Sequence, residues 1–253
     1  MRNYTRALLL IVLTSLTLFS CRKDRVNGGS IITEEREVAM SFDKIVLDAS
    51  FDVILVDNVD YNIRIECPER KMEYIKTTVV GDELIIREEF NHIVTNKSKK
   101  IYIATNYLTG IEIRKSGDLE GDLTLVPSME IEIEGSGDVD LNFDATGNVE
   151  VTIHGSGDVD LDFVAEGNFV VDIDGSGDVK ANGEADQLIV SVNGSGNIDT
   201  KTLEVFDADI FVDGSGDTFV KASNLLHVQL SGSGDVYYLV VLSWMFQILE
   251  VVM

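Results

Sequence analysis

Three aspartates, Asp138, Asp158 and Asp178, recur at steps of 20 residues, and each follows a Gly-Ser-Gly tripeptide. If equivalent positions stack about 4.8 Å apart, neighbouring carboxylates repel by about 1 kcal/mol in water. A bound cation such as Ca²⁺ would relieve this repulsion, so the column is a candidate metal site. Asp and Gly are also the residue types of tight corners, where the Asp side chain bonds backbone N–H groups. We favour the corner and predict neither metal nor cofactor, because calcium-binding β-roll repeats have a shorter, nine-residue period and Asn197 replaces the next Asp.

The tetrapeptide Gly-Ser-Gly-Asp, or its Asn variant, organises the second half of the chain. A fixed period of this size indicates stacked copies of one supersecondary unit. A degenerate copy, Lys115 to Asp118, precedes the series. The first residues of the copies, at steps of 18 to 20, are Gly135, Gly155, Gly175, Gly194, Gly214 and Gly232.

Apolar residues alternate with polar ones on both sides of each tetrapeptide. Val151 and Ile153 precede one copy, with Glu150 and Thr152 as the alternating residues. This period of two predicts a strand with one buried face. Each repeat therefore reads as strand, corner, strand and second corner, the second corner being marked by Gly-Asn. Because every copy keeps the same phase, we predict an all-β fold, a parallel β-solenoid with coils of about 20 residues.

The N-terminal residues read as an export signal, with Arg2 and Arg6 before an apolar run that is too short for a spanning helix. Leu18-Phe19-Ser20-Cys21 resembles a bacterial lipobox, so we predict a signal peptide over 1–20 and lipid on Cys21 as the membrane anchor. The alternative is ordinary secretion with cleavage near Ser20. In either case Cys67 reads as a packed thiol, because no Cys/His pattern accompanies it.

Four segments follow the signal peptide. We assign 21–35 to a polar, Gly-bearing tether and 36–238 to one β-helix domain. That domain comprises irregular coils over 36–114 and the Gly-Ser-Gly-Asp repeats over 115–238. Residues 239–253 are an atypical tail in which twelve of fifteen residues are apolar. Two interpretations stay open for this tail, a hydrophobic cap over the last coil or a frameshifted end.

The net charge of −24 lies entirely in the repeat half. Residues 1–115 hold 17 basic and 17 acidic residues, whereas 116–253 hold three Lys, no Arg and 27 Asp or Glu. Nucleic acids require a basic surface, so we exclude them as partners. A basic or neutral ligand is compatible with this charge.

Catalysis finds little support in the sequence. Some parallel β-helices cleave polysaccharides, but that chemistry needs a positioned base or a pair of carboxylates in a cleft, and a fold alone does not define a function. The repeats lack Arg and long insertions, and His92, His154 and His227 are scattered at surface positions. We predict that the protein is not an enzyme.

An ordered set of motifs resembles the bacterial putative auto-transporter adhesin family, head GIN domain. The motifs, over about 36–238, are Phe42-Asp43-Lys44-Ile45, Phe51-Asp52-Val53-Ile54-Leu55, Tyr61 to Glu66, Gly81 to Ile86 and the Gly-Ser-Gly-Asp series. The resemblance implies a right-handed parallel β-helix in a cell-envelope lipoprotein, which we expect at the outer membrane as an adhesin that binds a glycan or protein. The alternatives are a structural or stress-responsive envelope protein without a dedicated ligand, and a polysaccharide-active enzyme.

Overall fold

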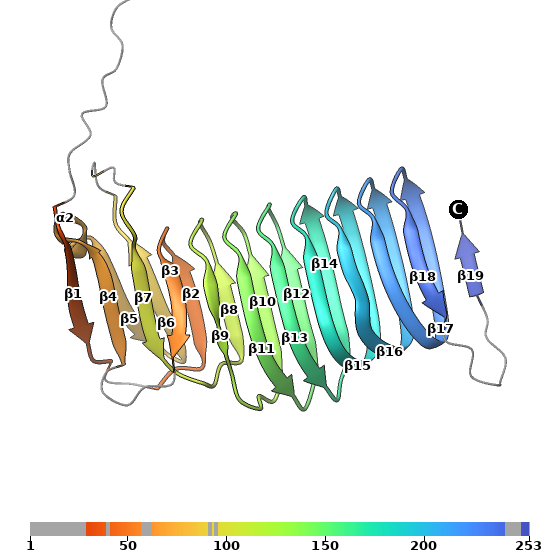
Figure 1. Ribbon diagram of the computed structural model, residues 1–253, viewed down its shortest axis with the longest axis horizontal. Helices are drawn as coiled ribbons and strands as arrows, with labels where there is room; N and C mark the ends of the chain where they lie inside the picture. Colours follow the sequence, from red (N-terminus) through yellow and green to blue (C-terminus); the bar gives the residue numbers. More distant parts are fainter. Residues whose placement is uncertain are drawn as a thin grey trace, which may run out of the picture.

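The computed structural model describes residues 29–38, 41–56, 62–90, 93, 96–240 and 249–252. About 66% of the chain is strand and 2% is helix, and parallel coils of about 20 residues stack into a β-solenoid of about six turns. Figure 1 shows the coils side by side along the long axis, from β1 at one end to β18 and β19 at the other. The predicted signal peptide and Cys21 lie outside the described residues.

The strands form two walls. The first wall contains the strands that precede each Gly-Ser-Gly-Asp corner, namely β8 (Gly110–Ile113), β10 (Met129–Ile133), β12 (Val149–Ile153) and β14 (Phe169–Gly175). The second wall contains the strands that follow it, namely β9 (Leu119–Asp122), β11 (Val139–Ala145) and β13 (Val159–Ala165). Within both walls the pairing is parallel and like residues face like residues, as predicted.

Three later strands run through the second corner without a break. β15 (Val179–Gly194), β16 (Ile198–Gly214) and β17 (Thr218–Gly232) each pair along both walls. β18 (Val236–Val240) and β19 (Leu249–Val252) then pair in parallel with the two halves of β17. β18 and β19 therefore continue the stack. Residues 241–248, in the predicted tail, lie outside the described part, and neither interpretation of the tail is tested.

The N-terminal end is built differently from the repeats. β2 (Lys44–Asp48) and β3 (Asp52–Val56) start the parallel walls, pairing with β8 and β9, while β6 (Glu83–Glu88) and β7 (Lys100–Ala104) lie on their other edges. Outside these lie the antiparallel pairs β1 (Ile31–Arg36) with β4 (Ile63–Pro68), β4 with β7, and β5 (Ile75–Val80) with β6. The irregular coils expected over 36–114 are thus partly antiparallel. At this end of the stack β1 and β5 are the outermost strands.

The tether expected over 21–35 overlaps the folded domain. β1 begins at Ile31 and pairs with β4 over its whole length. Arg36 also ties β1 to the other wall, because its guanidinium donates to the backbone carbonyl of Ile75 at 2.9 Å. The folded domain therefore starts before residue 36. A four-residue helix, α2 (Glu69–Met72), follows β4, and no helix among the described residues is long and apolar enough to cross a membrane.

The core lies between the two walls, as the alternation of residues predicts. Val151 and Ile153 are fully buried, while Glu150 is exposed and Thr152 half-exposed. Val151 packs in register between Ile131 and Val171 of the adjacent coils. Each coil thus buries its inward face against its neighbours, which makes the stack the cooperative unit.

Close approach of adjacent coils explains the corner glycines. A Cβ built on Gly155 would lie 2.1 Å from the carbonyl oxygen of Gly135, and one on Gly157 would lie 2.1 Å from that of Gly137. Glycine is common in tight corners because it tolerates positive φ angles. Positive φ does occur, as at Gly194 (146°) and Gly232 (121°), but the missing side chain is the requirement that recurs from coil to coil.

Candidate functional site

The corner aspartates link successive coils. The backbone N–H of Asp158 donates to Oδ1 of Asp138 at 2.8 Å, and that of Asp178 donates to Oδ1 of Asp158 at 2.8 Å. The column continues below through Asp118 and above through Asn197, Asp217 and Asp235. The sequence predicts a corner role in which the Asp side chain bonds backbone N–H groups, and such a bond usually lies within one turn. The acceptor in fact serves the next coil, because stacking brings that N–H directly over the carboxylate.

Two neighbouring donors moderate the charge of this column. Asn197 donates from Nδ2 to Oδ1 of Asp178 at 2.9 Å, so the amide both continues the column and removes one repulsive step. Beside the column, Lys180 pairs with Asp160 at 2.6 Å, which holds the pKa of Lys180 above its usual value. Among the described residues no group of three or more His, Cys, Asp or Glu side chains converges as metal ligands would. Asp138, Asp158 and Asp178 therefore act as acceptors between coils in this structure.

A network of charged side chains lies near the N-terminal end of the solenoid. Lys71 Nζ lies 2.5 Å from Glu88 Oε1, with both side chains about nine-tenths buried. Ser50 Oγ donates to Glu88 Oε2 at 2.9 Å, and Lys99 Nζ lies 2.8 Å from Ser50 Oγ. Burial alone would raise the pKa of Glu88, but hydrogen bonds from Lys71 and Ser50 outweigh it and lower the pKa. Burial lowers the pKa of Lys99. Because these side chains satisfy one another's charges and hydrogen bonds, we interpret the network as stabilising the fold.

The described part of the chain contains one thiol, Cys67, and two imidazoles, His154 and His227. Cys67 is buried and free, and burial raises the pKa of its thiol to about 11. A thiol with such a pKa is a poor nucleophile at neutral pH. His154 is exposed, whereas His227 contacts Asp209 at 3.4 Å and packs edge-on against Phe211. His92 lies outside the described residues.

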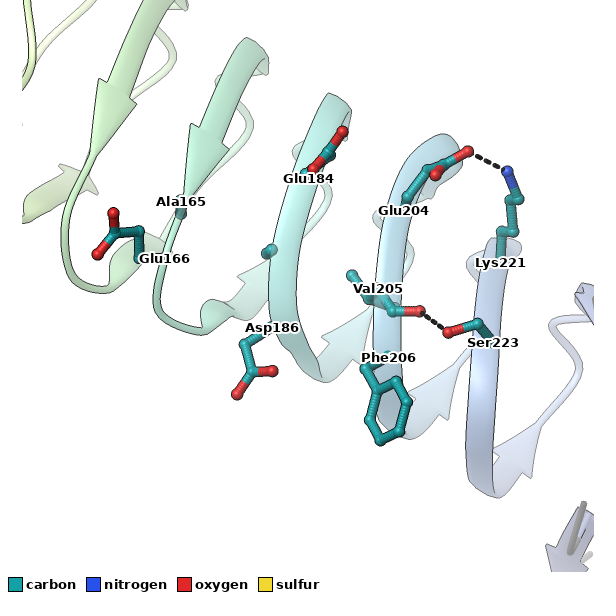
Figure 2. Close-up of a pocket in the computed structure, with 10 residues that line it drawn as sticks. Ala165, Glu166, Glu184, Asp186, Glu204, Val205, Phe206, Lys221 and Ser223 are labelled. Carbon is teal, nitrogen blue, oxygen red and sulfur yellow. Dashed lines mark hydrogen bonds and ion pairs between the residues drawn. The ribbon is translucent and has the colours of Figure 1, made fainter. Parts of the chain in front are cut away.

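A surface groove lies along the second corners of β13 to β17 (Figure 2). Its floor consists of small buried side chains from successive coils, Ala165, Ala185 and Val205. Its volume is about 490 Å³. Figure 2 shows two rims, with Glu184, Glu204 and Lys221 along one side, and Glu166, Asp186 and Phe206 along the other.

Changes in coil length shape this groove. Before the second corner Val164 pairs with Glu184, and after it Phe169 pairs with Leu188. The stretch from Glu184 to Leu188 is one position shorter than the stretch from Val164 to Phe169 that it covers, so β15 is shortened at this corner. The register shifts again between β16 and β17. Thr200 pairs with Val220, whereas Val205 pairs with Ala222, so β17 uses fewer residues than β16 beside Lys221.

Phe206 is the most unusual member of the groove lining. It occupies an outward strand position, and its side chain is 56% exposed. Lys221 pairs with Glu204 at 2.6 Å, and Ser223 Oγ donates to the carbonyl of Val205 at 3.1 Å. The groove thus combines an exposed ring, a small apolar floor and carboxylate rims.

Sequence reasoning missed the groove. The signals were present, because the steps from Gly175 to Gly194 and from Gly214 to Gly232 are shorter than the others, and Phe206 breaks the polar outward pattern. The sequence alone does not show that the short steps and Phe206 fall near the same corner, so these signals did not predict a groove. Spacing between tetrapeptides reports the length of a coil, not the place within it where a residue is lost.

The fold is a two-walled parallel β-solenoid with a groove along its second corners. The chain belongs to the family described as "Putative auto-transporter adhesin, head GIN domain", which matches residues 41–147 and 144–240. The predicted family resemblance is therefore confirmed. No curated protein matches the chain.

Solved structures of other bacterial proteins share the architecture. A protein described as a putative lipid binding protein from Parabacteroides distasonis is 22% identical, with a TM-score of 0.76, over 90% of this chain and 96% of that one. A putative adhesin from the same species is 19% identical, with a TM-score of 0.72, over 90% and 100%. A putative adhesin from Bacteroides fragilis is 22% identical, with a TM-score of 0.58, over 88% and 93%. At these identities the likeness establishes the fold.

Proposed function

We propose that the protein is a non-enzymatic adhesin or binding module of the bacterial cell envelope. Membership of an adhesin family supports this class. The observation that carries the proposal is the groove at the second corners, where an exposed Phe206 and a floor of small side chains lie open on the flank of a rigid solenoid. Exposed apolar groups in a concavity are characteristic of recognition surfaces.

The absence of catalytic function is part of the proposal. Near the N-terminal end, Lys71, Glu88, Ser50 and Lys99 bond one another, and the Lys71–Glu88 pair is about nine-tenths buried. The corner aspartates are likewise engaged, by backbone N–H groups. The purified protein should release no product from acidic or neutral polysaccharides. Product release that disappears on mutation of one carboxylate would contradict this.

The membrane attachment rests on the sequence Leu18-Phe19-Ser20-Cys21. Lipid on Cys21 would hold the solenoid at the outer membrane, with the residues before Ile31 as a short tether. Cys21→Ser should move the protein from the membrane fraction to the soluble fraction of cells. Retention of this variant in salt-washed membranes would exclude the lipid anchor.

A direct test of binding uses the Cys21→Ser chain, purified without detergent, on glycan and protein arrays. We expect reproducible retention of one class of glycan or protein, weakened by Phe206→Ala. Because Phe206 is exposed, this variant should fold as the parent does. Uniform lack of retention on both arrays would instead favour a structural envelope protein without a dedicated ligand.

A further inference from the structure

The second-corner groove has the size and composition of a binding site for a short polypeptide segment. Its volume of about 490 Å³ falls within the range of about 300 to 1,000 Å³ typical of ligand pockets. The floor of Ala165, Ala185 and Val205 offers buried methyl groups rather than polar atoms. An aliphatic stem can lie on such a floor without losing hydrogen bonds.

Phe206 gives the groove a specific contact. Its ring lies on the same rim as Asp186 and Glu166 and is more than half exposed (Figure 2). An aromatic ring next to carboxylates matches a guanidinium, which stacks on rings and also pairs with carboxylates in a fork. A metal ion would gain nothing from the ring or the apolar floor.

The charge of the groove favours the same ligand. Lys221 is engaged by Glu204 at 2.6 Å. Among the described residues no cation pairs with Glu166, Glu184 or Asp186. The whole repeat half carries the net charge of −24, so a cationic partner is steered toward this surface and an anionic one is repelled.

We propose that this groove binds an arginine-bearing segment of a partner polypeptide. The guanidinium lies over Phe206 and pairs with Asp186, and the aliphatic stem crosses Ala185 and Val205 toward Glu184. This assignment rests on the proposed binding function and names the chemistry of its ligand.

The test measures fluorescence anisotropy of labelled Ala-Arg-Ala-Arg-Ala-Arg with the Cys21→Ser chain. The groove variant is Glu184→Gln/Asp186→Asn. The matched control is Glu150→Gln/Asp172→Asn, which removes the same charges from exposed positions on the first wall. We expect the groove variant to weaken binding about tenfold, the size of one charge-assisted contact, and the control less than about twofold.

Phe206→Ala isolates the ring, because it leaves the charge unchanged. We expect about a threefold loss, the scale of an exposed cation–π contact, with an unchanged circular dichroism spectrum. Equal losses in the groove variant and its control would reduce the effect to diffuse attraction and overturn the assignment. Absence of peptide binding, with array ligands still retained through Phe206, would overturn the assignment while leaving the proposed binding function intact. Absence of both would overturn both.

Discussion

The coils between Met129 and Gly175 and those of β15 to β17 share one corner and differ at the other. In the first set every coil has 20 residues and a Gly-Asn turn at the second corner. In the second set the coil length varies and the strand bends through that corner without a turn. The Gly-Ser-Gly-Asp corner keeps its register in both sets. The changes in length fall after it, in the second wall between Lys180 and Asn182 and beyond Thr200, and at the second corner that follows, where the groove lies.

Both sets of coils alternate buried and outward-facing residues along each strand. A substitution that breaks this alternation should lower the stability most. Val151→Asp places a charge at a fully buried position between Ile131 and Val171. An unpaired carboxyl buried here must either stay charged or take up a proton, and even the second costs several kcal/mol, a large share of the stability of a typical domain. We expect insoluble or unfolded protein. Thr152→Asp, at the adjacent half-exposed position, should yield soluble protein with a near-normal urea transition, and equal behaviour of the two variants would contradict the stacked coils.

The N-terminal coils lack the Gly-Ser-Gly-Asp corner and contain a buried ion pair between Lys71 and Glu88. Lys71→Met leaves Glu88 buried without its cation, and breaking such a pair costs about 3 to 5 kcal/mol. Urea unfolding measures the loss. The double variant Lys71→Met/Glu88→Leu should recover part of it, whereas no recovery would mean that the lysine acts through packing alone.

The lowered pKa of Glu88 also predicts a dependence on pH. A carboxyl whose pKa is lower when folded stabilises the fold fully above its unfolded pKa of about 4.3 and loses that contribution as the pH falls toward the folded value. The free energy of unfolding should therefore fall below about pH 4, and it should fall less steeply in Glu88→Gln. Parallel pH profiles for the two proteins would remove Glu88 as a contributor.

The repeat corner itself depends on close approach. Gly155→Ala would place a Cβ 2.1 Å from the carbonyl oxygen of Gly135, and overpacking of this kind costs about 1 to 3 kcal/mol. Ser156→Ala, at the exposed neighbouring position, should change stability by less than about 0.5 kcal/mol. Thermal melts of the two variants separate a packing requirement from a mere turn preference.

Asp158 should show the smallest effect. Asp158→Ala removes the acceptor for the backbone N–H of Asp178, a loss of about 1 kcal/mol. Asp158→Asn keeps the acceptor, as Asn197 does naturally, and should unfold at a urea concentration closer to that of the parent. A stability of Asp158→Asn equal to that of Asp158→Ala would mean that charge, rather than the hydrogen bond, matters at this position.

Local periodicity accounts for the parts of this structure that could be predicted. Alternation at Val151 and Ile153 predicted the buried face, and the constant phase of the tetrapeptides predicted stacked parallel coils. The hydrogen bond from Asp158 N–H to Asp138 joins residues 20 apart, so it could be placed only after the coils had been aligned. The antiparallel pairing of β1 with β4 was missed because Ile31 lies in a short segment beside polar, Gly-bearing sequence, and its strand forms through partners that are distant in the sequence.

The groove was harder still to predict than the core. The groove depends on the positions within β15 and β17 at which these strands are shorter than their neighbours. The spacing between tetrapeptides does not define these positions. The sequence suggested no role for Phe206. Phe206 lines the groove together with Ala185, Asp186 and Lys221, and only the stacking of three coils brings these residues together.

The most direct test of the contrast between the two corners is a pair of single-residue insertions. Gly inserted after Asp186 restores the length of the preceding coil, in which Ala165-Glu166-Gly167-Asn168 forms the second corner. Gly inserted after Gly175 instead lengthens the corner whose N–H groups bond the coil below. We predict that urea unfolding will give a loss below about 1 kcal/mol for the first insertion and several times that for the second. Equal losses, or a greater loss for the first, would contradict the claim that the Gly-Ser-Gly-Asp corner holds the register while the second corner is free to vary.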